Sequence, residues 1–172
     1  MKNLKKFVAL LLAGVMAMVM LTACSGGTTA DTEKEEAIRK QLGKRTEATS
    51  LCDRDGKVEN DSQLYKETAK LLDARIKAET SAFGILAVHF DVKGIDPVEQ
   101  YVTVTLSADY KTAGLVAGLI TKITEELGKI ESTNNSVKLD TEWAKAAVVV
   151  RTNEKGSYAA IAIQVKNIAY KG

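Results

Sequence analysis

Two stretches of the chain place their apolar residues at the spacing of a helix that is buried along one side. The shorter stretch covers residues 61–80 and the longer one covers residues 109–130. Side chains three or four positions apart lie on the same side of a helix, so each stretch carries one apolar stripe. The stripes consist of Leu64, Thr68, Leu71, Leu72 and Ile76 in the first helix and of Val116, Leu119, Ile120, Ile123, Leu127 and Ile130 in the second. We expect both stripes to face a core, with Asp61 or Ser62 capping the shorter helix.

Four shorter stretches alternate apolar and polar residues, which is typical of strands with one covered face. They are residues 83–92, 101–107, 143–151 and 158–166. In the clearest of them, residues 101–107, valine and leucine alternate with tyrosine, threonine and serine. Turn residues around Gly94 separate the first two strands, and residues 153–156 separate the last two. The pattern therefore predicts two antiparallel hairpins.

The order helix, strand, strand occurs twice, over residues 62–108 and 110–166, which resembles a loose structural duplication without a residue-level repeat. The simplest packing is an α+β two-layer sandwich, in which a four-stranded antiparallel sheet carries both long helices on one face. We expect residues 61–172 to form this single domain. Residues 31–60 are a charged, helix-prone and loop segment, in which Thr32 and Glu35 fit a capping box at the start of a marginal helix.

The first 24 residues have the three regions of a secretory signal. Residues 1–6 carry three lysines, residues 7–20 form an uncharged apolar run, and Leu21-Thr22-Ala23-Cys24 follows. A basic end, a short apolar run and small residues at the cleavage site are typical of such signals. An apolar run of 14 residues is short for a membrane span, which usually takes about 20.

The Leu-Thr-Ala-Cys tetrad resembles the lipobox of bacterial lipoproteins, and the resemblance covers residues 1–24. It implies that the thiol of Cys24 receives a diacylglyceryl group and that a signal peptidase cuts between Ala23 and Cys24. It further implies a protein held on the bacterial cell membrane by fatty acids such as palmitate, facing outside the cytoplasm. Two acyl chains anchor a protein stably where one is marginal. Residues 24–30 are small and mostly polar, so we expect a flexible tether there.

The charge balance changes when the leader is set aside. The whole chain has 24 basic and 22 acidic residues, a net of +2. Loss of the three leader lysines leaves 21 basic against 22 acidic residues, a net of −1. A nucleic-acid interface needs clustered Lys and Arg, which the sequence lacks, so we expect no nucleic-acid partner. Cys52 is the only other cysteine besides Cys24. It could be a reactive thiol, a site of intermolecular disulfide pairing, or a small buried apolar group. The adjacent Asp53 disfavours a thiolate, so we expect an unreactive group.

Few side chains qualify for catalysis or for metal binding. His89 is the only histidine, and Asp91 shares its strand face, so the two are considered as a base with its orienting carboxylate. No motif places a nucleophile, and one His with one Cys supplies too few ligands for zinc. We therefore expect no catalytic residue, metal or cofactor. Residues 53–56 begin like a calcium loop, but the later ligands are missing, so a plain turn is expected.

Two surfaces remain as candidates for a partner. The ligand-binding candidates are polar or aromatic strand residues, namely Tyr101, Thr103, Thr105, His89 and Tyr158. An open Tyr/Thr-rich sheet face can bind a protein or cell-wall carbohydrate, although antiparallel sheets commonly expose one face to solvent. Gly114 and Gly118 share one side of the long helix, where they allow close approach to the sheet or to a partner helix, with a dimer as the less favoured alternative.

These features favour a membrane-anchored extracytoplasmic domain that is not an enzyme and that binds a partner or serves the envelope structurally. Residues 112–166 contain a helix followed by Ala-Val-Val-Val and then Tyr-Ala-Ala-Ile-Ala-Ile. This pattern resembles sporulation lipoproteins of the YhcN/YlaJ type, which implies a spore or cell-envelope lipoprotein as one alternative. A weak hydrolase that uses His89 is the other alternative.

Overall fold

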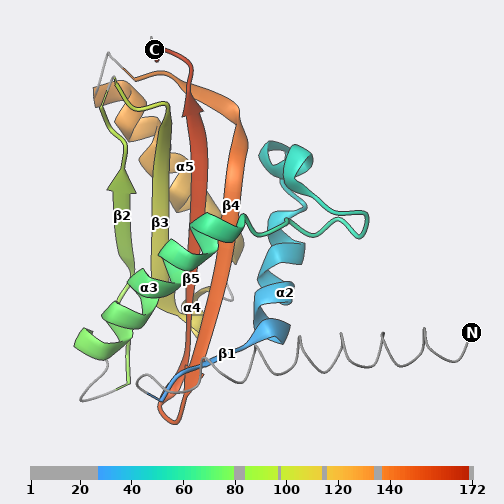
Figure 1. The fold of residues 1–172 in the computed structure, drawn as a ribbon, viewed down its shortest axis with the longest axis vertical. Helices are drawn as coiled ribbons and strands as arrows, with labels where there is room; N and C mark the ends of the chain where they lie inside the picture. Colours follow the sequence, from blue (N-terminus) through green and yellow to red (C-terminus); the bar gives the residue numbers. More distant parts are fainter. Residues whose placement is uncertain (1–26, 80–83, 97, 114–115, 134–136, 171–172) are drawn as a thin grey trace, which may run out of the picture.

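The computed structural model is built around one antiparallel sheet (Figure 1). It describes residues 27–79, 84–96, 98–113, 116–133 and 137–170. Its strands are β1 (Thr29–Ala30), β2 (His89–Lys93), β3 (Tyr101–Asp109), β4 (Leu139–Asn153) and β5 (Gly156–Asn167), in the order β1-β4-β5-β3-β2. The helices are α2 (Thr32–Leu42), the 3-10 helix η1 (Thr46–Leu51), α3 (Ser62–Glu79), α4 (Tyr110–Ala113) and α5 (Val116–Thr133). The prediction of a mixed fold with one antiparallel sheet is confirmed.

The alternation of side chains along the strands decides what each face of the sheet meets. On one face, Val104 of β3 and Ile161 of β5 join residues of α2 and α5 in the main core. On the other face, Tyr158 and Ala160 of β5 pack against α3. The described residues of the predicted α5 stripe are all buried, namely Leu119, Ile120, Ile123, Leu127 and Ile130. The alternation predicted for β3 and β5 and the part of the α5 stripe from Leu119 to Ile130 are therefore confirmed. The side chain of Val116 lies outside the described residues.

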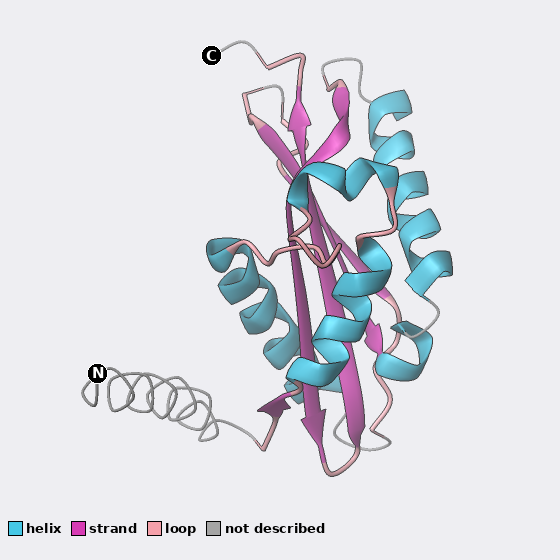
Figure 2. Ribbon diagram, turned by 90° about the vertical axis from the view of Figure 1, so that its right-hand side faces the viewer, coloured by secondary structure: helices cyan, strands magenta, loops and turns pink. Residues whose placement is uncertain are grey.

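The prediction of two layers with both long helices on one face is wrong, because the sheet lies between α3 and α5. Figure 2 shows the sheet along its edge with helices on both sides. The cause is the run of consecutive apolar residues at 146–150 of β4, all of which are buried. Successive side chains of a strand point to opposite faces, so such a run makes both faces apolar and both need a cover. α3 covers Ala147 and Val149, and the opposite core includes Val148 and Val150.

The sheet has five strands and not four, because residues 29 and 30 form β1. The sequence assigns these residues to the flexible tether, yet Thr29 pairs with Thr152 and Ala30 pairs with Arg151 of β4. A strand of two residues is too short to show an alternation. Its formation depends on the exposed edge of β4, which sequence patterns do not reveal.

The placement of the helices also bears on the suspected duplication. A two-fold axis that exchanges the hairpin of β2 and β3 with the hairpin of β4 and β5 stands perpendicular to the sheet. Such a rotation leaves each helix on its own face of the sheet. Because α3 and α5 lie on opposite faces, the two halves of the domain are not related in this way.

Several elements begin or end elsewhere than predicted. The strand expected over 83–92 begins only at His89, although Leu86 is buried and its carbonyl accepts a hydrogen bond from the Asp109 N–H. The long helix expected over 109–130 is observed as α4 and α5, and residues 114 and 115 between them lie outside the described residues. The hairpin of β4 and β5 is longer than predicted and reaches from Leu139 to Asn167.

Helix α2 is docked firmly, although its few apolar positions predict a marginal helix. Ile38 and Leu42 are fully buried in the main core. Its N-cap is Asp31, whose Oδ1 accepts a hydrogen bond from the Lys34 N–H at 3.2 Å, and not Thr32 as the predicted capping box requires. The carboxylate of Glu35 does not fold back onto the cap, because it binds the edge of β4 instead. Asp61 caps α3, as predicted, by accepting from the Leu64 N–H at 2.9 Å.

Candidate functional site

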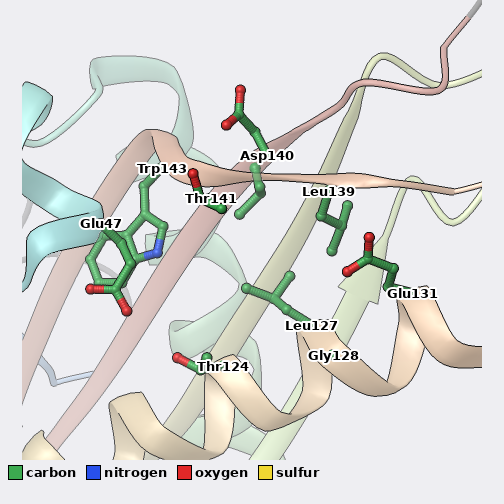
Figure 3. A pocket seen from close by; sticks show the side chains of 10 residues that line it. Glu47, Thr124, Leu127, Gly128, Glu131, Leu139, Asp140, Thr141 and Trp143 are labelled. Carbon is green, nitrogen blue, oxygen red and sulfur yellow. The ribbon is translucent and has the colours of Figure 1, made fainter.

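A cleft of about 310 Å³ opens between α5 and the first half of β4 (Figure 3). Its apolar lining consists of Leu127, Leu139, Trp143 and Val165. Its polar lining consists of Glu47, Thr124, Glu131, Asp140 and Thr141, with Gly128 beside them. Four separate segments therefore contribute to the cleft, which lies at the end of the sheet away from β1.

An irregularity of β4 turns Trp143 into this cleft. The register between β4 and β5 shifts between Leu139 and Trp143 and again between Trp143 and Lys145. In a regular strand, Trp143 would share a face with Lys145 and lie opposite to Ala146. Trp143 instead belongs to the same core cluster as Ala146. Such bulges bend a strand and re-aim its side chains, and they are common beside binding sites.

Trp143 is the only tryptophan of the chain, and just 4% of its surface is exposed. Figure 3 shows the nitrogen-bearing edge of its indole turned toward the space between β4 and α5. Among the described residues, no side chain or carbonyl accepts a hydrogen bond from this N–H. The nitrogen atom itself is not sealed off by protein atoms, so this donor is available to a molecule in the cleft.

Three carboxylates give the cleft a negative charge, and none of its lining residues is basic. The Glu47 carboxylate accepts from the Arg45 guanidinium at 2.9 Å. The backbone N–H of Glu47 itself and this guanidinium lower the pKa of the Glu47 carboxyl, so the group is ionised at neutral pH. Asp140 and Glu131 are exposed at the rim, and the described part of the chain holds neither in an ion pair.

His89 and Asp91 do not form the predicted pair of base and orienting carboxylate. The His89 Nε2 lies 2.5 Å from Glu79 Oε2, and both Asp91 oxygens lie 2.7 Å from an Arg75 nitrogen. Arg75 also pairs with Glu79 at 3.3 Å. The two strand residues share a face, as predicted, but each meets its own partner because Arg75 and Glu79 are one turn apart on α3. This chain of contacts fastens the edge strand β2 to α3.

The other predicted ligand-binding residues do not gather in one cavity, and none of them lines the Trp143 cleft. Tyr158 is fully buried under α3, where its hydroxyl donates to the Gly84 carbonyl at 2.9 Å. Thr105 is also buried. Tyr101 and Thr103 are half-buried, and Thr103 accepts a hydrogen bond from Gln164 at 3.0 Å. The face expected to be open is therefore covered over part of its length, since α3 packs there.

Three smaller predictions concern a thiol, a turn and a glycine pair. Cys52 is half-buried, with its sulfur 3.3 Å from the Ala48 carbonyl oxygen. Residues 53–56 form the expected turn, in which Asp53 Oδ1 accepts the N–H of Asp55 at 2.9 Å. Gly118 is exposed and a Cβ there would meet nothing within 4 Å, so it is not needed for close approach to the sheet. Gly114 lies outside the described residues.

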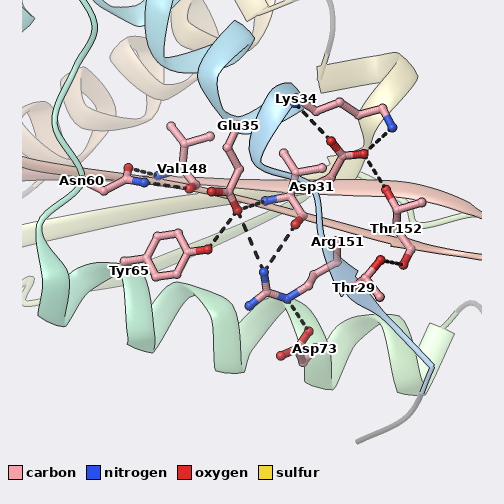
Figure 4. A network of polar contacts seen from close by, with 11 residues as sticks. Thr29, Asp31, Lys34, Glu35, Asn60, Tyr65, Asp73, Val148, Arg151 and Thr152 are labelled. Carbon is pink, nitrogen blue, oxygen red and sulfur yellow. Dashed lines mark hydrogen bonds and ion pairs between the residues drawn. The ribbon is translucent and has the colours of Figure 1, made fainter. Parts of the chain in front are cut away.

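The most buried carboxylate, Glu35, belongs to a second polar group at the edge of β4 (Figure 4). It accepts hydrogen bonds from the Val150 N–H and from the Tyr65 hydroxyl, each at 2.9 Å. The Arg151 guanidinium lies 3.9 Å away and also binds Asp73 at 3.1 Å. Exposed strand edges invite pairing with other chains. Glu35 therefore closes the edge of β4 where β1 ends, which is a structural role.

Glu35→Gln is expected to gain stability relative to the unchanged chain as the pH rises from about 4 to 7. Burial raises the pKa of Glu35, and its hydrogen bonds and Arg151 offset this only in part. A carboxyl whose pKa is higher in the folded chain stabilises the fold fully below its unfolded pKa, and this stability is lost as the pH rises through the folded pKa. Urea unfolding at several pH values measures the difference. A difference that stays constant with pH would contradict the raised pKa.

Neither a metal site nor a membrane-spanning helix in the described part of the chain, nor a similar protein, indicates a function. Among the described residues, no group of three or more His, Cys, Asp and Glu side chains is placed to hold a metal ion. No helix in that part of the chain has both the length and the apolar character needed to span a bilayer. No family model matches the chain, and neither a curated protein nor a solved structure matches it.

Proposed function

We propose that this protein is a lipid-anchored lipoprotein on the outer side of a bacterial cell membrane, whose body binds a ligand in the Trp143 cleft without transforming it. The observation that carries the anchor is the Leu-Thr-Ala-Cys tetrad directly after a basic end and an uncharged apolar run. The cleft supports binding, since it combines apolar walls with a few polar groups, as small-molecule sites do.

Strand β1, at which the proposed tether ends, and the cleft lie at opposite ends of the sheet. β1 begins at Thr29, five residues after Cys24, so an extended tether spans at most about 17 Å. Thr29 pairs with Thr152 near one end of β4, and Trp143 lies toward the other end. Nine residues of strand at roughly 3.3 Å each separate the two positions by about 30 Å. The proposed arrangement holds the body close to the bilayer and opens the cleft to dissolved ligands.

Binding is favoured over catalysis by the way in which the reactive groups are used. The Thr124 hydroxyl in the cleft donates to the Ile120 carbonyl of its own helix at 3.1 Å. His89, the residue of the hydrolase alternative, is held by Glu79 on the opposite side of the sheet from the cleft. Nucleophilic catalysis needs a nucleophile within hydrogen-bond reach of its base, and no hydrogen bond of the described residues joins a hydroxyl or thiol to His89.

Cys24→Ala is expected to abolish membrane anchoring, because its sulfur is the proposed site of the lipid. The chain is expressed in a bacterium that is fed an alkyne-tagged palmitate analogue, and membrane and soluble fractions are compared. The unchanged protein is expected to carry label, to stay with the membrane, and to show the intact mass of residues 24–172 plus a lipid. Cys52→Ala is the matched control and should keep both label and location. A retained leader or an unmodified Cys24 would overturn the anchor.

A further inference from the structure

We propose that the ligand of the Trp143 cleft is a small organic cation, an ammonium or guanidinium compound that also carries a neutral hydrogen-bond acceptor. This inference rests on the proposed binding function and specifies its ligand. It follows from three properties of the cleft: its charge, the position of the indole N–H, and its size.

The charge of the lining selects a cation. Glu47, Glu131 and Asp140 contribute three carboxylates, and Arg45 pairs with only the first of them. An anionic ligand would meet like charges here, and a neutral ligand would leave the two rim carboxylates without a counter-charge. Apolar walls strengthen the attraction of a cation, because the effective dielectric constant beside a protein surface is lower than in water. The carboxylates are not grouped closely enough to hold a metal ion.

The indole of Trp143 selects an acceptor. More than nine-tenths of this side chain is buried, and its N–H edge faces the cleft without an acceptor among the described residues. The N–H atom itself is not sealed off by protein atoms, so a ligand oxygen can reach it from the cleft and accept its hydrogen bond. The carboxylates repel a ligand carboxylate, so the acceptor is a hydroxyl or a carbonyl. We place the cation and the acceptor on one molecule, because the indole of Trp143 and the rim carboxylates line the same cleft.

The size of the cleft suits a small ligand. Its volume of about 310 Å³ is at the lower end of the roughly 300–1,000 Å³ found for small-molecule sites. An amino alcohol with a short aliphatic chain has the required parts: the chain contacts Leu127 and Leu139, the hydroxyl accepts from Trp143, and the ammonium reaches the rim carboxylates.

A set of matched probes tests the proposal on unlipidated residues 24–172, which contain the whole described core. 5-Amino-1-pentanol has a cation and an acceptor, pentylamine has the cation alone, and 1,5-pentanediol has no charge. Because Trp143 is the only tryptophan, its single indole N–H resonance in an NMR titration reports on the cleft. We expect a saturable shift with 5-amino-1-pentanol, weaker binding of pentylamine, and the weakest binding of 1,5-pentanediol.

Charge variants separate the cleft from general attraction to an acidic surface. Glu131→Gln and Asp140→Asn are each expected to weaken binding of 5-amino-1-pentanol about three- to fivefold. Glu125→Gln is the matched control, because Glu125 is exposed on the same helix and does not line the cleft. The affinity is also expected to fall at about 1 M salt, where the screening length is about 3 Å.

Two results would overturn the inference in different ways. If 1,5-pentanediol shifts the indole resonance with the same affinity as 5-amino-1-pentanol, the cleft binds ligands without reading charge, and the proposed binding function stands. If none of the probes moves the resonance, the cleft is not a site for small cations and binding there is itself in doubt. The labelling of Cys24 is independent of both results.

Discussion

Glu35→Ala is expected to lower the free energy of unfolding by about 3 kcal/mol at neutral pH, because it leaves buried partners without an acceptor. Glu35 is 5% exposed and is the acceptor of the Val150 N–H and the Tyr65 hydroxyl. The methyl group of alanine cannot replace either bond. Arg151 would lose Glu35 and keep its contacts with Asp73 and with the Val150 carbonyl.

Asn60 and Asp31 also form hydrogen bonds with the backbone at the edge of β4, beside those of Glu35. The Asn60 side chain accepts from the Val148 N–H at 2.8 Å and donates to the Val148 carbonyl at 3.3 Å. The Asp31 N–H donates to the Val150 carbonyl at 3.2 Å. Loss of Glu35 therefore opens a gap in a protected edge, and we expect aggregation of the variant to increase as well.

Glu36→Ala is the matched control for this prediction. Glu36 is the next residue of α2, it is exposed, and its contact with Lys57 at 3.9 Å is a surface pair of small value. Chemical unfolding followed by circular dichroism gives the free energy of unfolding of both variants. Equal losses in the two variants, or a loss below about 1 kcal/mol in Glu35→Ala, would contradict the role assigned to the buried carboxylate.

Gly43→Ala is expected to lower the free energy of unfolding by about 3 kcal/mol, since there is no room for a side chain where α2 ends. A Cβ at Gly43 would overlap the carbonyl of Gly56, with the carbon of that carbonyl at 2.9 Å and the Cys52 sulfur at 3.3 Å. The obstacle is backbone, so either α2 or the turn at residues 53–56 must move. That movement would also strain the hydrogen bond from Arg39 to the Val58 carbonyl.

The same substitution at Gly118 provides a control of opposite sign. Gly118 is exposed on α5 and a Cβ there meets nothing within 4 Å. Alanine is favoured over glycine in a helix, so Gly118→Ala should raise the free energy of unfolding by about 0.5 kcal/mol. Thermal unfolding of the two variants is compared with that of the unchanged chain. Stabilisation by Gly43→Ala would show that α2 and the turn are not in close contact.

The candidate site was hidden from sequence reasoning for a specific reason. Trp143 lies in a predicted strand whose alternation would direct it away from Ala146. The register shifts around it reverse that direction, and no residue pattern announces them. Glu47 and Glu131 are distant in sequence and come to the cleft only when η1 and α5 pack beside β4. One sequence signal existed, since the only tryptophan of the chain follows three residues after Asp140, but this spacing did not indicate a cavity.

Local pattern was sufficient for the position of α3, the buried side of α5, the alternation in β3 and β5, and the turn at residues 53–56, because these depend on spacing within one segment. The consecutive apolar residues of β4 also indicated a strand that is covered on both faces, although the predicted two-layer architecture covers only one. Tertiary structure alone decided which helix covers which face, the addition of β1, the partner of Glu35 and the existence of the Trp143 cleft. Each of these depends on contacts between segments far apart in the chain, whose free energy no local pattern records.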